Sequence, residues 1–114
     1  MVRWKHVHLK NNLITSWGQY GAGSISHAHL RVEKNIFESG GSALAVHSVN
    51  WGGGNSNGLV KKISNLQNGF TIEVNNPDAV FIPPYLATEP AVTADPTLEA
   101  KIKCGAGARW GASC

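Results

Sequence analysis

Apolar and polar residues alternate most clearly in two short stretches of this chain, residues 6–10 and 29–33. The apolar positions in these stretches are Val7, Leu9, Leu30 and Val32. Alternation with a period of two predicts β-strands whose apolar side chains point inward. Four further segments have the composition of short strands: residues 22–25, 43–46, 59–63 and 70–74.

The two alternating stretches belong to longer segments that match each other at a spacing of 23 residues. Residues 7–14, which read VHLKNNLI, correspond to residues 30–37, which read LRVEKNIF. A repeat of this length built from short strands is typical of a solenoid, in which each turn of the chain stacks on the previous one. The spacing also places Lys10 beside Glu33, which is a favourable pair of charges.

Asn12 and Asn35 occupy equivalent positions of this repeat, directly after the alternating stretches. Asparagine tolerates a left-handed backbone and forms side-chain hydrogen bonds at turns. We therefore expect both residues at the same corner of successive turns, hydrogen-bonded to each other.

The chain becomes irregular after its strand-like segments. Residues 49–58 are rich in Gly and Asn and predict an excursion loop. Five prolines follow between residues 77 and 96, which excludes a central strand and predicts an extended segment running over the stacked turns. Asp95 as N-cap, Pro96 at the first helical position and Gly105 beyond the end predict a short helix that caps the solenoid.

Length and composition fit one small β-rich domain. The 114 residues include 13 glycines, and charged residues make up 15% of the chain, which is below the roughly 25% of an average soluble protein. The net charge is +3, but the basic residues are scattered, so we expect no nucleic acid partner; an acidic polysaccharide is compatible. No long apolar run or signal-peptide core is present, so we expect neither a membrane span nor a targeting signal in this chain.

The only two cysteines, Cys104 and Cys114, lie close together near the end of the chain. We expect them to form a disulfide in an oxidising compartment, because the Gly-rich segment between them lets the ends meet. Two reduced thiols are the alternative.

Histidines and aromatic residues suggest further chemistry. His6 and His8 share one strand face, as do His27 and His29, and the repeat brings His6 near His29. Two or three of these imidazoles could bind zinc or copper, or they could form a metal-free polar stack. An aromatic set could stack on sugar rings or simply pack against loops: Trp4, Trp17, Tyr20 and Trp51. The acidic residues form no tight cluster of oxygen ligands, so no calcium site is assigned.

Residues 3–14, which read RWKHVHLKNNLI, resemble a motif of the pectate lyase and pectin lyase superfamily, in which an Arg precedes a strand of the form (V/L)-H-x-x-N-N. Residues 30–37 resemble the next turn in that family, (V/L)-x-x-E-x-N-x-F. Tyr85 and the Ala-Gly-rich residues 105–108 are also similar to its C-terminal end.

This resemblance implies an all-β fold, a partial right-handed single-stranded parallel β-helix. Residues 1–114 would be the C-terminal part of one such domain, with coils over about residues 3–75 and an irregular part with a short helix over about residues 76–114. His8 would be the family's structural strand histidine.

The resemblance also implies a function, cleavage of polygalacturonate by β-elimination in a secreted, calcium-dependent parent enzyme. Arg3 matches the family's arginine that binds a substrate carboxylate. The catalytic arginine and the calcium ligands would precede Met1, so no catalytic or metal-binding residue is assigned and we expect this chain to be inactive alone.

Two alternatives remain open. One is a pectin lyase, which acts on the methylated polymer and needs no calcium. The other is a non-catalytic β-helix that binds acidic glycans or has a structural role.

Overall fold

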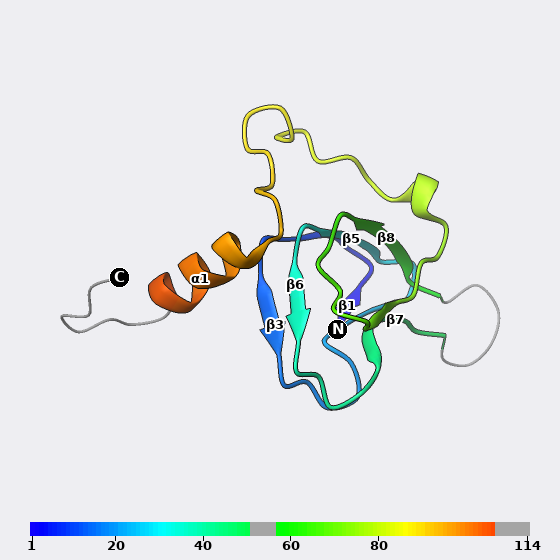
Figure 1. The fold of residues 1–114 in the computed structure, drawn as a ribbon. Helices are drawn as coiled ribbons and strands as arrows, with labels where there is room; N and C mark the ends of the chain where they lie inside the picture. The colour runs from blue at the N-terminus through cyan, green and yellow to red at the C-terminus, as the bar shows by residue number, and fades with distance from the viewer. Residues whose placement is uncertain (51–56, 107–114) are drawn as a thin grey trace.

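The chain folds into three parallel β-sheets that it visits in a repeating order (Figure 1). The computed structural model describes residues 1–50 and 57–106. Sheet A consists of β1 (Val2–Arg3), β4 (Ala22–Ile25), β7 (Leu44–Ser48) and β9 (Thr71–Ile72). Sheet B consists of β2 (His6–Lys10), β5 (His29–Glu33) and β8 (Leu59–Ile63). Sheet C consists of β3 (Leu13–Thr15) and β6 (Ile36–Glu38).

The strand register confirms the 23-residue repeat. Val7 pairs with Leu30 in sheet B, and Leu13 pairs with Ile36 in sheet C. The strands over residues 22–25 and 59–63 have the expected bounds, whereas β7 begins one residue late and β9 is shorter than expected. The protein is therefore mainly β-structure in parallel sheets with one short helix.

The hydrophobic core lies between the three sheets and receives side chains from each of them. Sheets A, B and C contribute, among others, Val46, Leu30 and Phe37, all of which are fully buried. Trp17 belongs to this core, with its ring edge against Phe37 and its Nε1 donating to the main-chain oxygen of Ser42 at 3.1 Å. A sugar-stacking role for Trp17 is thus wrong, and Trp51 lies outside the described residues.

An asparagine row, formed by Asn12, Asn35 and Asn65, connects successive turns at the corner after sheet B. The Oδ1 of Asn35 accepts from the main-chain N–H and the side chain of Asn12 at 2.9 and 3.1 Å, as expected. The left-handed backbone, however, belongs to the preceding residues Asn11, Lys34 and Ser64. The prediction of a left-handed backbone at Asn12 and Asn35 was therefore wrong by one residue.

Residues 76–95 form a strap that crosses the outer face of sheet B, which confirms the expected extended segment (Figure 1). It begins with a short 3₁₀ helix, Pro77–Ala79, beside β8. At its far end Asn11 and the main chain of Val92 exchange two hydrogen bonds. The strap thus runs from β8 across β5 and β2.

Helix α1 (Pro96–Gly105) follows the strap. Asp95 accepts a hydrogen bond from the main-chain N–H of Leu98, as an N-cap does, and the helix ends one residue later than expected. Lys103 pairs with Glu38 of sheet C at 3.3 Å. The helix projects from the stacked strands in Figure 1, and its expected role as a cap stays a prediction. No helix within the described residues is long and apolar enough to span a membrane.

Candidate functional site

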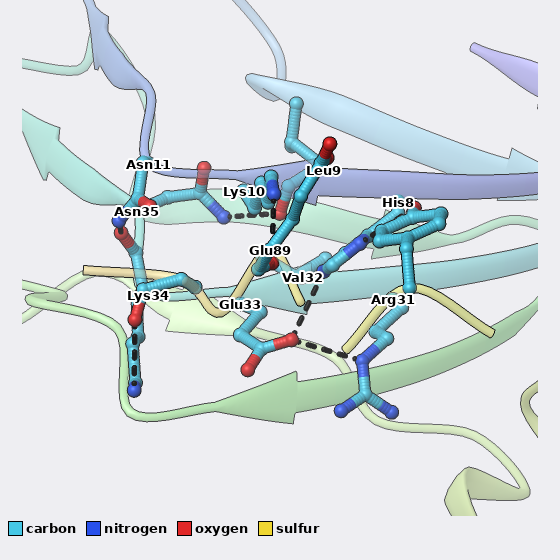
Figure 2. Close-up of polar contacts among 12 residues, drawn as sticks. His8, Leu9, Lys10, Asn11, Arg31, Val32, Glu33, Lys34, Asn35 and Glu89 are labelled. Carbon is cyan, nitrogen blue, oxygen red and sulfur yellow. Dashed lines mark hydrogen bonds and ion pairs between the residues drawn. The ribbon is translucent and has the colours of Figure 1, made fainter. Parts of the chain in front are cut away.

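A buried polar network lies between the strap and the outer face of sheet B (Figure 2). Glu33 Oε1 lies 2.9 Å from His8 Nε2 and 3.0 Å from Arg31 Nε. The side chains of His8, Arg31 and Glu33 are only 4%, 8% and 9% exposed, respectively. Burial raises the pKa of the Glu33 carboxyl, but hydrogen bonds from Arg31 and His8 outweigh it and leave the pKa lowered.

The network ties the strap to the sheet. Tyr85 contributes its hydroxyl, which lies 2.9 Å from His8 Nδ1. The expected Lys10–Glu33 pair has the correct backbone register, but Lys10 instead donates to the main-chain oxygen of Glu89 at 3.1 Å (Figure 2). Because Glu33 is already held by Arg31 and His8, Lys10 is available to bind the strap.

A second strap contact involves the histidine pair. The rings of His6 and His29 lie 4.3 Å apart, as the repeat predicts, and the ring of Phe81 stacks on His6. The main-chain N–H of Phe81 donates to His29 Nδ1 at 3.1 Å, so that nitrogen carries no proton. Burial and the neighbouring His6 lower the pKa of His29.

These contacts occupy histidine nitrogens that a zinc or copper ion would need as ligands. Both ring nitrogens of His8 and one of His29 already have protein partners. Within residues 1–50 and 57–106, no three His, Cys, Asp or Glu side chains gather in a way that could hold a metal ion.

The outer face of sheet A carries a different set of polar residues. Val2, Val46 and Ile72 pack in or against the core, so the residues that follow them, Arg3, His47 and Glu73, point to the outer face. Arg3 is exposed. His47 Nδ1 forms a hydrogen bond with Glu73 Oε1, and the two side chains are 32% and 41% exposed, respectively.

Sequence reasoning missed the His47–Glu73 pair. The two residues are 26 positions apart, whereas the recognised repeat has a spacing of 23. Alternation around Val46 and Ile72 could have indicated that both residues face outward.

The remaining sequence-predicted residues lie apart from these clusters. Trp4 is 68% exposed at the corner between β1 and β2, where its ring lies 5.7 Å from that of His27. Cys104 lies on α1, whereas Cys114 is outside the described residues, so the disulfide stays a prediction. Arg3 is on sheet A, whereas the buried polar network lies on sheet B.

Comparisons with protein-family models, curated proteins and solved structures found no match to this chain.

Proposed function

We propose that this chain is part of a right-handed parallel β-helix from a secreted polysaccharide lyase that acts on polygalacturonate. Two features of the fold support the proposal: three parallel sheets visited in cyclic order, and an asparagine row at one corner. The motif of residues 3–14 supports it from the sequence.

The observation that carries the proposed substrate is the exposed position of Arg3 on the outer face of sheet A. A guanidinium can bind a carboxylate through two parallel hydrogen bonds, and a polyuronate offers one carboxylate per sugar. In β-elimination, a base removes the proton beside that carboxylate and the glycosidic bond breaks. Arg3 would hold the carboxylate and balance the negative charge that develops there.

Calcium would belong to the parent enzyme. The described residues do not fit a calcium site, because no suitable group of acidic side chains is present among them. We therefore assign no step of the reaction to calcium in this chain, and we expect the chain alone to release no unsaturated uronate from polygalacturonate.

Gel retardation in polygalacturonate tests the proposal. The native chain should be retarded, and Arg3→Ala should reduce the retardation more than Lys62→Ala, which removes an exposed cation from β8 on sheet B. Methylation of the polymer should remove the difference between native chain and Arg3→Ala, because it removes the carboxylate. Equal effects of the two variants would show attraction to net charge alone and contradict the proposal.

A lyase assay separates the proposal from its non-catalytic alternative. Adding a polypeptide with the family's upstream coils should restore formation of unsaturated uronate if the chain is a lyase part. Polymer binding without restored activity would favour a glycan-binding β-helix instead.

A further inference from the structure

The His47–Glu73 pair sits in a row of three neighbouring strands on the outer face of sheet A. Gly23 on β4 pairs in register with His47 on β7, and Glu73 directly follows β9. Ser48 donates its main-chain N–H to Glu73 Oε1 at 3.1 Å. The carboxylate is thus fixed by two donors, and it orients the imidazole through Nδ1, so Nε2 of His47 faces away from the pair.

Tyr20 lies beside this pair. Its ring centroid is 5.3 Å from that of His47, and the ring covers Gly23 so closely that a Cβ there would lie 2.8 Å from Tyr20 Cε2. The absence of a side chain at Gly23 therefore lets the tyrosine ring lie against the sheet, next to the imidazole. The Tyr20 ring therefore lies next to two half-exposed hydrogen-bonding groups, the His47 imidazole and the Glu73 carboxylate.

We propose that His47, Glu73 and Tyr20 form a subsite for the hydroxyl groups of a sugar ring, an inference that rests on the proposed polyuronate function. Sugar hydroxyls donate to a carboxylate and to an imidazole nitrogen, while the apolar face of the ring packs on an aromatic side chain. Glu73 would repel a purely anionic group, so this place suits the hydroxyls of a polyuronate and not its carboxylates.

The position of Arg3 complements this subsite. Neighbouring strands are about 4.8 Å apart, so β1 lies about 10 Å across sheet A from β7. One polyuronate chain lying across the sheet could place a carboxylate at Arg3 and the hydroxyls of a nearby sugar at His47 and Glu73. Sheet A thus presents a cation for the carboxylates of the polymer and hydrogen-bonding groups for its hydroxyls, and every uronate unit carries both kinds of group.

The test measures binding of defined oligogalacturonates and of their methyl esters by isothermal titration calorimetry. Glu73→Gln and His47→Ala should each weaken binding about fivefold to tenfold, the loss of one or two hydrogen bonds. The loss should persist in high salt and with the methyl esters, because hydroxyls carry no charge. The effect of Arg3→Ala should instead fade under both conditions.

Glu89→Gln is the matched control, since it neutralises an exposed glutamate on the strap and should leave binding unchanged. A thermal unfolding midpoint of Glu73→Gln equal to that of the native chain would exclude a folding defect. Gly23→Ala displaces the Tyr20 ring without removing a polar group, and it should also weaken binding.

The outcomes separate the two proposals. Native affinity in Glu73→Gln and His47→Ala would overturn the subsite while leaving Arg3 and the polyuronate function intact. Tighter binding by Glu73→Gln would also overturn it, because Glu73 would then only repel the polymer. No affinity of the native chain for any oligogalacturonate would refute both.

Discussion

The side chain of Asn65 accepts two hydrogen bonds from Asn35, one from its main-chain N–H at 2.9 Å and one from its Nδ2 at 3.2 Å. Asn35 in turn accepts from Asn12 and donates to the main-chain oxygen of Leu9 at 2.7 Å. Its side chain is fully buried. The row therefore satisfies main-chain groups at a corner where the ladders of sheets B and C are interrupted.

Replacing Asn35 with alanine should destabilise the protein by about 3 kcal/mol, because the variant leaves the Asn12 N–H without its acceptor and removes one hydrogen bond each from the Leu9 carbonyl and the Asn65 side chain. Asn12→Ala is the comparison, since Asn12 is half-exposed at the end of the row and should lose only about 1 kcal/mol. Urea unfolding measures both. Similar small losses in the two variants would mean that the row is not a main source of stability.

Only part of the asparagine row could be predicted from the sequence. Identical turn lengths made Asn12 and Asn35 visible as a pair, but Asn65 lies 30 residues after Asn35 because the intervening turn is longer. Local rules likewise located the helix start at Asp95. They could not locate the contact of His8 with Tyr85, 77 residues apart, because the strap has no periodicity and its position depends on the assembled sheet.

In the candidate site, too, the sequence predicts one part and not the other. The outward position of Arg3 follows from its place after Val2, whereas the His47–Glu73 pair depends on two turns of unequal length coming into register. Alternation predicts which face a side chain occupies, but it does not predict its neighbour on the next strand once the repeat length varies.

Glu33 should make stability depend on acid pH. Its pKa is lowered in the folded state by Arg31 and His8, despite the opposing effect of burial, so its contribution is present above the ordinary glutamate pKa of about 4.3. The contribution is lost as pH falls through the lowered value. Glu33→Gln should cost about 3 kcal/mol at neutral pH, because it leaves the buried Arg31 without its carboxylate.

Unfolding free energies measured from neutral to acid pH test this role. The native chain should lose stability in the acid range, and Glu33→Gln should lose less there. Glu89→Gln, which changes an exposed residue of the strap, should follow the native curve. Parallel curves for the native chain and Glu33→Gln would contradict the assignment.

His29 should make docking of the strap sensitive to mildly acidic pH. Burial and His6 lower its pKa, so the folded state favours neutral His29, and this contribution is present above the ordinary histidine pKa of about 6.5. It declines as pH falls through the lowered value, because protonated Nδ1 can no longer accept from Phe81. Hydrogen exchange of the Phe81 amide, corrected for intrinsic rates, should lose protection between about pH 7 and pH 5.

The Val92 amide provides an internal comparison, since it donates to Asn11 Oδ1 at 2.8 Å and no histidine is its acceptor. His29→Asn, which keeps a neutral acceptor, should abolish the pH-dependent step at Phe81. A step that survives in this variant would assign the effect to another group.

Calcium should leave the stability of this chain unchanged. We expect calcium not to bind the folded chain, because residues 1–50 and 57–106 hold no group of side chains suited to a metal ion. An ion that does not bind the folded state cannot stabilise it. Thermal unfolding with calcium should match unfolding with magnesium at equal ionic strength. A midpoint raised by calcium alone would locate a site that the structure does not account for.

The chain should self-associate through the end formed by β1, β2 and β3, each of which is the outermost strand of its sheet. Val7 and Leu9 are half-buried there, whereas their partners Leu30 and Val32 are fully buried. An apolar edge with unpaired main-chain groups can pair with another chain, and an inward-pointing charge prevents such pairing. Sedimentation velocity should show association that grows with concentration and is reduced in Val7→Lys, but not in Ile82→Lys, which alters an exposed strap residue. A single monomeric species at all concentrations, or equal association of the two variants, would show that this end does not recruit a second chain.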